Sequence, residues 1–214
     1  MAPYICTACG GPKCMYCGHN WRKWWTRGGS RYRGHETDVE GLYGTWVTDT
    51  LLLMSRPSTR INREYSLPTR LHSSGIRAIV CLQEVGEHPF CGDNLQESGL
   101  SYMPDEFERE GIKFINPSWE DLNVPTVEHM LNVVKFMYGI ISAGGKVAVH
   151  CHAGLGRAGL TGCCYLLYSD STQTSESVLD LVRRKRSSGT VQNDKQEQFL
   201  RDFEAFARAG KPRL

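Results

Sequence analysis

The sequence lacks the features of a membrane-spanning or secreted protein. No stretch approaches the roughly 20 apolar residues that a spanning helix needs, and the N-terminus has neither the basic start nor the apolar run of a signal peptide. A strong charge of one sign is also missing, because the formal net charge is only +2. This balance argues against nucleic acid or a membrane surface as the main partner. We therefore expect a soluble cytoplasmic monomer, and leave nuclear or cytoskeletal association open.

Internal repeats and low-complexity segments are absent as well. A chain of 214 residues with 40% hydrophobic content suits one compact domain. The nine cysteines are an odd number, and Cys163 and Cys164 are adjacent, which favours reduced thiols over a disulfide framework. Residues 1–35 are rich in Cys, Gly, Arg and Trp without a sustained hydrophobic period, so we predict an irregular arm there and a folded domain over residues 36–214.

The arm carries two CxxC pairs, formed by Cys6, Cys9, Cys14 and Cys17. Four thiolates can bind zinc. Only four residues separate the two pairs, which is much less than the usual interval between such pairs. Zinc therefore stays an alternative, and we interpret these residues as packing cysteines and predict no metal site.

The hydrophobic pattern of the folded domain alternates between strands and helices. Short apolar runs rich in β-branched residues predict strands at 76–82, 112–115 and 146–150, with one or two more within 46–55. Helices are predicted at 67–73, from Pro125 to before Gly144, and at 156–168, 175–186 and 194–207. One face of the second helix would carry Val127, Met130, Leu131, Val134 and Tyr138. The order strand, helix, strand implies a parallel crossover. The predicted fold class is α/β, with a central, mostly parallel sheet flanked by helices.

The run HCHAGLGRAG, residues 150–159, directly follows a predicted strand. Glycines in a loop between a strand and a helix allow several backbone N–H groups and the helix N-terminus to face one anion. The same groups favour the thiolate form of Cys151, which is then placed as a nucleophile. Arg157 can direct its planar fork to two oxygens of a phosphoryl group. The pattern predicts a phosphatase site whose substrate-binding residues are His152, Ala153, Gly154, Leu155, Gly156 and Arg157.

At these residues the sequence resembles the protein tyrosine phosphatase superfamily, whose signature is His-Cys, five residues and Arg. The motif GLGR makes the loop similar to small dual-specificity enzymes such as the Cdc14 and cyclin-dependent-kinase-associated phosphatases. A wider resemblance to the animal proteins that carry a protein tyrosine phosphatase domain rests on ACGG at 8–11, YGTWVTD at 43–49, RPS at 56–58, GEH at 86–88 and WED at 119–121. The resemblance implies the α/β phosphatase fold, a phosphocysteine intermediate and no cofactor.

The reaction needs a proton donor, because expelling an alkoxide or phenolate leaving group is costly. Asp121 occupies the place that the acid-bearing loop takes in the superfamily, so we predict it as the general acid. Glu120 and then Asp105 are the alternatives. A purely structural role for Asp121, capping the helix that starts near Pro125, is the other interpretation.

Hydrolysis of a phosphocysteine also requires a positioned water. Gln192 and Gln196 are four residues apart and could share a helical face. They match the Gln, three residues, Gln element that positions this water in the superfamily, and we predict that role. His150 has two interpretations, one in which it orders the loop by hydrogen bonding and one in which it is a structural core residue.

Three classes of function are compatible with a loop of this kind. The first is a phosphatase acting on phosphorylated proteins, at phosphotyrosine and at phosphoserine or phosphothreonine. The second is a lipid or RNA phosphatase of the same superfamily, which tends to place lysines in the loop or an Asn before the Arg, where this chain has His152, Leu155 and Gly156. The third is a non-catalytic binding scaffold, which usually loses the Cys, the Arg or the acid. The sequence favours the first.

Four further features of the sequence carry expectations. Ala158 stands where the superfamily usually has a Ser or Thr whose hydroxyl eases departure of the thiolate, so we expect slow breakdown of the intermediate. The run Arg183 to Arg186 is interpreted as a solvated helix end rather than a nuclear signal or a phosphoinositide site. Cys81 is interpreted as a buried structural thiol, with a reversible disulfide to Cys151 as the alternative. By resemblance, residues 86–88 border the site.

Overall fold

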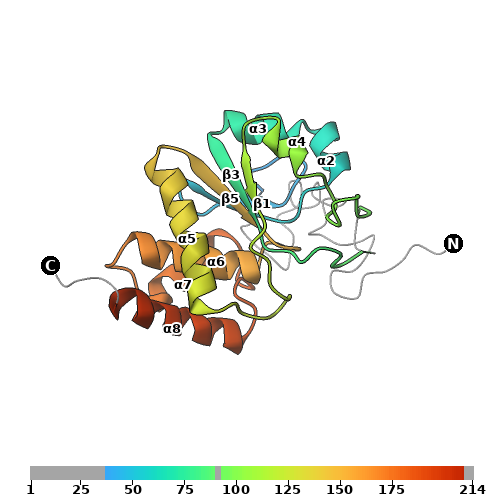
Figure 1. Cartoon of the computed structure of the whole chain (residues 1–214). Coiled ribbons are helices and arrows are strands. Elements are labelled where there is room, and N and C mark those ends of the chain that lie inside the picture. Colours follow the sequence, from blue (N-terminus) through green and yellow to red (C-terminus); the bar gives the residue numbers. More distant parts are fainter. Residues whose placement is uncertain (1–36, 90–92, 210–214) are drawn as a thin grey trace.

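The structure is a computed structural model, and it describes residues 37–89 and 93–209 (Figure 1). Its strands are β1 (Gly44–Trp46), β2 (Leu51–Met54), β3 (Ile76–Cys81), β4 (Lys113–Ile115) and β5 (Lys146–His150). Its helices are α2 (Thr59–Glu64), α3 (Leu67–Ser73), α4 (Asp105–Glu108), α5 (Val127–Ser142), α6 (Arg157–Ser169), α7 (Ser175–Lys185) and α8 (Asp194–Ala209).

The five strands form one sheet in the order β1-β2-β5-β3-β4. Strands β2, β5, β3 and β4 run parallel, and only β1 is antiparallel to its neighbour. Strand β5 is central, because it pairs with β2 on one side and with β3 on the other. This arrangement confirms the predicted α/β class with a mostly parallel sheet.

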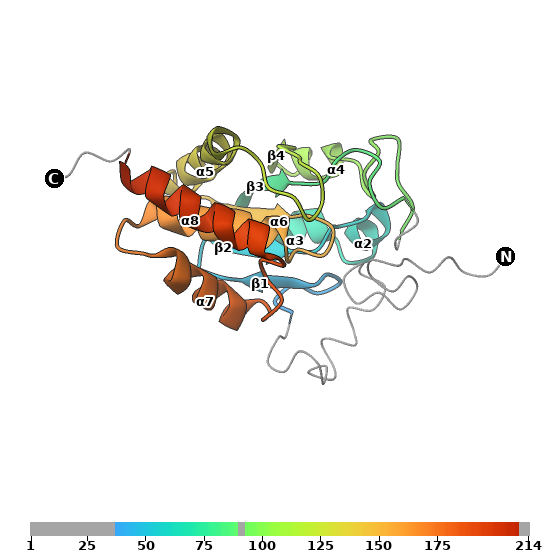
Figure 2. The same cartoon turned by 90° about the horizontal axis from the view of Figure 1, so that it is seen from below.

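Alternating side chains of the strands supply two hydrophobic cores, one on each face of the sheet. Leu53, Val80 and Val149 face the layer formed by α5, α6, α7 and α8. Leu52 and Ile79 face the opposite layer, which α2, α3 and α4 provide. Figures 1 and 2 show the two helical layers, with α6 in the middle of the larger one. The loop with the HCHAGLGRAG motif connects β5, the central strand, to α6, the middle helix of the larger layer. Both ends of this loop are therefore anchored in the interior of the fold.

Helix α5 differs in two details from its prediction. It begins at Val127, because the Thr126 side chain accepts a hydrogen bond from the N–H of His129 and thereby caps the helix. Pro125 therefore precedes the cap instead of opening the first turn. The buried face also turns away from Tyr138, which is 44% exposed, and the side chains on the sheet side are Met130, Val133, Val134 and Met137. These four follow the i, i+3, i+4, i+7 spacing of one helical face.

Two short helices were not predicted. Helix α2 begins directly after the Pro57-Ser58 turn, because the Ser58 side chain accepts from the N–H of Ile61 and caps it. Helix α4 is a single turn within the charge run after residue 103, and only Phe107 of its residues is buried. Both are too short to show a helical period in sequence.

The predicted N-terminal arm, with Cys6, Cys9, Cys14 and Cys17, lies outside the described residues, so its structure and the zinc alternative stay as predictions. Among the described residues, no helix has the length and apolar character needed to cross a membrane.

Candidate active site

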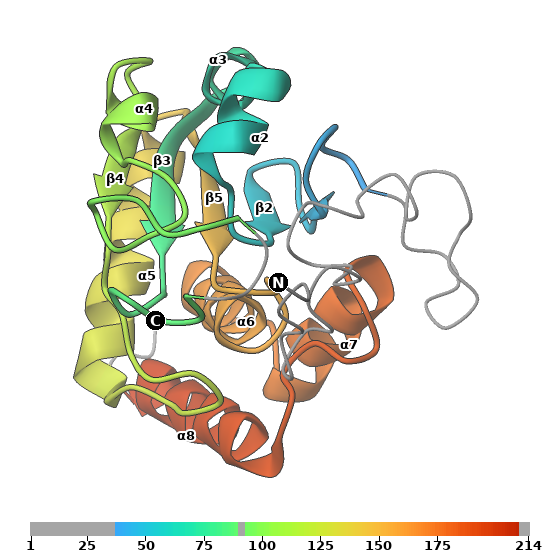
Figure 3. The same cartoon turned by 90° about the vertical axis from the view of Figure 1, so that its right-hand side faces the viewer.

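The loop from His150 to Arg157 begins at the C-terminal end of β5, beside the C-terminal end of β3. It leads into the first turn of α6 (Figure 3). Its carbonyl groups are held from outside the loop. The His152 carbonyl accepts from the N–H of Arg56 at 3.0 Å, and the Leu155 carbonyl accepts from the N–H of Val191 at 3.2 Å. These bonds tie the loop to the segments after β2 and before α8.

The two carbonyls in the middle of the loop are held by one side chain. Arg186 donates from Nε to the Gly154 carbonyl at 3.0 Å and from Nη2 to the Ala153 carbonyl at 3.3 Å. In a planar trans peptide, the N–H points opposite to the C=O, and no described peptide bond is cis. The N–H groups of residues 153–156 therefore turn to the inner side of the loop, and none of them donates to an acceptor in the described part of the chain. Four free donors facing one concavity form a cradle for an anion.

Close packing requires glycine at position 154 of the loop and leaves little room for a side chain at position 156. Gly154 has a φ of +72°, and a Cβ there would lie 2.2 Å from the Met54 carbonyl oxygen. At Gly156 a Cβ would lie 2.4 Å from Oε1 of Gln192. A side chain at position 154 would push the loop away from β2, and one at position 156 would displace the Gln192 side chain.

Cys151 is the first residue after β5 and is 3% exposed. It belongs to the core on the α6 side of the sheet, whereas Cys81 belongs to the core on the other side. Cys81 pairs in register with His150, so it and Cys151 point to opposite faces. This placement argues against the alternative of a disulfide between them, and burial raises the pKa of Cys81 to about 12. The predicted burial of the Cys81 thiol is confirmed.

His150 is fully buried, and both ring nitrogens have partners. Nδ1 lies 3.2 Å from the Cys151 carbonyl and Nε2 lies 2.7 Å from the Tyr102 hydroxyl. A carbonyl only accepts, so Nδ1 carries the proton, and Nε2 accepts from Tyr102. Burial lowers the pKa of His150 to about 3, so the ring is neutral. Through the Cys151 carbonyl, His150 orders the start of the loop, which favours the first of its two predicted interpretations.

Arg157 is fully buried at the start of α6. Its Nη1 donates to the carbonyls of Leu82 and Trp119, both at 2.9 Å. Glu87 forms a bidentate pair with it, at 2.7 Å to Nη1 and 2.6 Å to Nη2. Burial alone would lower the pKa of Arg157, but Glu87, Cys151 and Asp121 raise it above its ordinary value. The guanidinium is therefore charged and fixed along its Nη1–Nη2 edge, beside Cys151.

The other edge of the guanidinium faces Asp121. Nε of Arg157 lies 3.1 Å from Oδ1 of Asp121, which is ion-pair distance, but the N–H is not aligned for a hydrogen bond, and Nε has no such partner in the described structure. Oδ2 of Asp121 lies 3.1 Å from Nε2 of His88. Burial would raise the pKa of Asp121, but His88 and Arg157 outweigh it and lower the pKa to about 2.

His88 also stacks on His152, with 4.2 Å between the ring centroids. Burial, together with the charge of Arg56, lowers the pKa of His152 to about 2 and keeps its ring neutral. Two stacked imidazole rings, those of His88 and His152, therefore lie beside Asp121.

The alternatives to Asp121 do not reach this site. Glu120 is exposed and accepts from the side chain of Asn123 at 3.0 Å. Asp105 is in α4 and pairs with Arg109 at 2.6 Å. The cap of α5 is Thr126, so the helix-capping interpretation of Asp121 is wrong.

Gln192 and Gln196 both lie against Gly156, but they do not share a helix as predicted. Gln192 precedes α8, where Val191 has a φ of +58°, and Gln196 lies in the first turn. The fully buried Gln196 accepts from the N–H of Gln192 at 2.9 Å through Oε1. The turn before α8, and not helical periodicity, brings the two side chains together.

The interpretation of Arg183 to Arg186 as a solvated helix end is wrong for two of its members. Arg186 is fully buried under the loop. Arg183 pairs with Glu197 at 2.7 Å and donates to the carbonyls of Thr190 and Val191. The C-terminus of α7 packs against the loop, which the sequence pattern of an amphipathic helix does not reveal.

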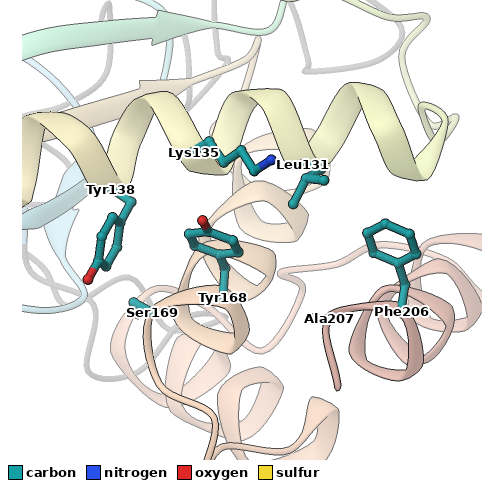
Figure 4. A pocket seen from close by; sticks show the side chains of 7 residues that line it. All are labelled: Leu131, Lys135, Tyr138, Tyr168, Ser169, Phe206 and Ala207. Carbon is teal, nitrogen blue, oxygen red and sulfur yellow. The ribbon is translucent and has the colours of Figure 1, made fainter. Parts of the chain in front are cut away.

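Two other features lie away from this loop. No group of three potential metal ligands occurs among residues 37–89 and 93–209. A hollow of about 400 Å³ lies between α5, the end of α6 and α8, as Figure 4 shows, and its lining residues are Leu131, Lys135, Tyr138, Tyr168, Ser169, Phe206 and Ala207. It lies at the C-terminal end of α6, whereas the loop opens the N-terminal end, so it is not part of the candidate site.

Sequence reasoning did not assign roles to Glu87, His88, Tyr102 and Arg186. The only signal for the first two was the resemblance to the family, which placed residues 86–88 at the border of the site but predicted no contacts. Tyr102 and Arg186 carried no signal, because each meets its partner across a long sequence separation.

Comparisons with known proteins agree with this geometry. A family model described as the dual specificity phosphatase catalytic domain matches residues 91–206, which is more than half of the chain. Protein tyrosine phosphatase domain-containing protein 1 of Bos taurus is 38% identical over 200 residues, covering 93% of this chain and 24% of the relative. Human cyclin-dependent kinase inhibitor 3 is 28% identical over 133 residues, covering 62% of this chain and 59% of the relative.

Among solved structures, Tk-PTP in its active form has a TM-score of 0.62 and 27% identity, covering 76% of this chain and 96% of that chain. The chain spans about a quarter of the length of the relative from Bos taurus. The match to more than half of its residues shows that the chain belongs to the dual specificity phosphatase catalytic-domain family of the protein tyrosine phosphatase superfamily.

Proposed function

We propose that the protein hydrolyses phosphotyrosine, phosphoserine and phosphothreonine in phosphorylated proteins through a phosphocysteine intermediate. The observation that carries the proposal is the convergence of four free N–H groups, residues 153–156, and a fixed Arg157 around Cys151. Such donors stabilise the charge that builds on the phosphoryl oxygens during transfer.

Arg157 has one edge left for substrate. Glu87 and two carbonyls occupy Nη1 and one side of Nη2, so Nε and the remaining hydrogen of Nη2 are available for two phosphoryl oxygens. This is the bidentate geometry in which arginine recognises phosphate. Glu87 therefore orients the guanidinium without competing for the edge that binds the phosphoryl group.

In the first step the Cys151 thiolate attacks phosphorus, an S–P bond forms, and the P–O bond to the substrate side chain breaks. Asp121 donates its proton to the leaving oxygen. In this structure Asp121 is ionised, with a pKa of about 2. A phosphoryl dianion on Arg157 would weaken the ion pair between Arg157 and Asp121 and repel the carboxylate, and both effects raise the pKa of Asp121. Substrate binding thereby favours the protonated acid.

In the second step a water attacks the phosphocysteine, the S–P bond breaks, and the released group is inorganic phosphate. Asp121, now ionised, accepts the proton of this water. Gln192 and Gln196 lie against Gly156 at the base of the loop, and we assign them the placement of the water. Ala158, which follows Arg157, has no hydroxyl to donate to the departing sulfur.

The substrate class is tested by initial rates on a panel of phosphotyrosine, phosphoserine and phosphothreonine peptides, phosphoinositides and triphosphate-ended RNA. The Cys151→Ser variant, prepared in the same way, controls for contaminating phosphatases. We expect the phosphopeptides to give the highest kcat/KM. A lipid or RNA preference of more than about tenfold, or about 1.4 kcal/mol, would overturn the assignment.

A further inference from the structure

Arg186 connects the cradle to β1, a strand at the edge of the sheet. Its Nε and Nη2 hold the Gly154 and Ala153 carbonyls, as described above. Its Nη1 donates to the Thr45 hydroxyl at 3.1 Å, and Nη2 also donates to the Tyr43 carbonyl at 3.2 Å. The guanidinium therefore bridges the middle of the loop and strand β1.

Tyr43 fixes the orientation of this bridge. The Arg186 guanidinium carbon lies 3.7 Å from the centroid of the Tyr43 ring, within the range of a cation–π contact. The Tyr43 hydroxyl returns a hydrogen bond to the Arg186 carbonyl at 2.8 Å. Both residues are fully buried, so the planar fork is held in one orientation against the two loop carbonyls.

The consequence for the loop follows from peptide geometry. The Ala153 carbonyl shares its peptide plane with the N–H of Gly154, and the Gly154 carbonyl shares its plane with the N–H of Leu155. Holding the carbonyls outward fixes these two N–H groups inward. A cation on the carbonyl end of a peptide also polarises its N–H end, which strengthens the hydrogen bond that the N–H donates.

We propose that Arg186 is a positioning residue of the phosphate site, because it aims the N–H groups of Gly154 and Leu155 at the bound oxyanion without touching it. The inference rests on the proposed function, since it presumes that the loop binds an oxyanion. It assigns Arg186 a role in affinity that is separate from its contribution to folding.

The test is the affinity of the full chain for inorganic tungstate, measured by calorimetry and as a competitive inhibition constant. In Arg186→Met the two carbonyls lose their donors, and we expect tungstate binding to weaken by about tenfold or more, with a similar loss of kcat/KM. In Arg186→Lys a single ammonium cannot reproduce the fork, and we expect a smaller loss, of about threefold to tenfold.

Matched variants separate positioning from stability. Thr45→Val removes one Arg186 contact on β1 but leaves both loop carbonyls held, so we expect a lower Tm with tungstate affinity within twofold of wild type. Arg184→Met makes the same change at the exposed neighbour that pairs with Asp180, and we expect no effect on affinity.

The outcomes distinguish this inference from the proposed function. Wild-type affinity in Arg186→Met, or in Arg186→Lys if the first variant does not fold, would overturn the inference alone, provided that the wild type binds tungstate and hydrolyses phosphopeptides. A loss of affinity in Thr45→Val equal to that in Arg186→Lys would also overturn it, because the effect would then follow stability. Absence of tungstate binding by the wild type would overturn the proposed function, and the inference with it.

Discussion

The ion pair between Glu87 and Arg157 gives the sharpest single prediction. Both carboxylate oxygens of Glu87 accept from Arg157, at 2.6 and 2.7 Å. Oε1 also accepts from the Gln83 side chain at 3.1 Å, and Oε2 from the N–H of Glu84 at 3.0 Å. Glu87→Gln keeps the size of the side chain but replaces one acceptor oxygen with an NH₂ group, which meets donors on either side.

The magnitude follows from the burial of the pair. The Arg157 side chain is 0% exposed and the Glu87 side chain 11% exposed. Removing one partner of a buried ion pair costs about 3–5 kcal/mol. We discount this because Gln keeps one hydrogen bond to Arg157 and because the Leu82 and Trp119 carbonyls still accept from it. We expect a loss of about 2–3 kcal/mol in the free energy of unfolding, which is a Tm decrease of about 4–12 °C for a domain of this size.

The effect on catalysis has a distinct signature. Without the carboxylate, the guanidinium is less fixed, and it contributes less to the transition state. The site also becomes more positive, which favours ground-state binding of the phosphoryl dianion. We therefore expect kcat to fall by about 10- to 100-fold while KM does not rise.

The assay combines thermal unfolding with steady-state kinetics on an aryl phosphate. Glu84→Gln is the matched control, because it makes the same chemical change at an exposed side chain of the same loop. Unchanged Tm and kcat in Glu87→Gln would refute the reasoning, since Arg157 would then be held by the carbonyls alone.

Cys151→Ser should abolish turnover yet retain tungstate binding, because the N–H cradle remains; turnover near wild type would assign the nucleophile elsewhere. Asp121→Ala should lower kcat strongly for phosphopeptides and much less for aryl phosphates with good leaving groups, and equal losses on both substrates would move the acid to another residue. Because Ala158 cannot donate a hydrogen bond worth on the order of 1.5–3 kcal/mol to the departing sulfur, rapid mixing should give a burst of leaving group close to one per site, and Ala158→Ser should shrink it and raise the steady rate. No burst together with an unchanged kcat in that variant would contradict this. Burial holds the folded-state pKa values of His150 and His152 at about 3 and about 2, below the unfolded value of about 6.5, so the unfolded chain binds more protons below that pH and stability is lost as the pH falls. Urea unfolding should show this loss between pH 7 and pH 5, and a slope that His152→Asn leaves unchanged would count against it.

The sequence by itself determined the fold class and the position of the loop between β5 and α6. Strands β3, β4 and β5 and helices α5 to α8 appear where periodicity predicted them, because long amphipathic helices and buried β-branched strands carry their signal locally. The spacing of Cys151, the glycines and Arg157 also acts locally, since one turn of the chain from β5 into α6 forms the cradle.

Tertiary structure decided which partners hold that loop. Glu87 is 70 residues from Arg157 in the chain, Tyr102 is 48 from His150, and Arg186 is 32 from Gly154. The sequence pattern indicated a solvated arginine at the end of α7, because a helix end favours a basic residue whether it faces water or a buried loop. Only the packing of α7 beside β1 brings Arg186 under the cradle. The residues that form the loop can therefore be predicted from the sequence. The contacts that orient its peptide groups cannot, because they come from elements that meet only in the assembled fold.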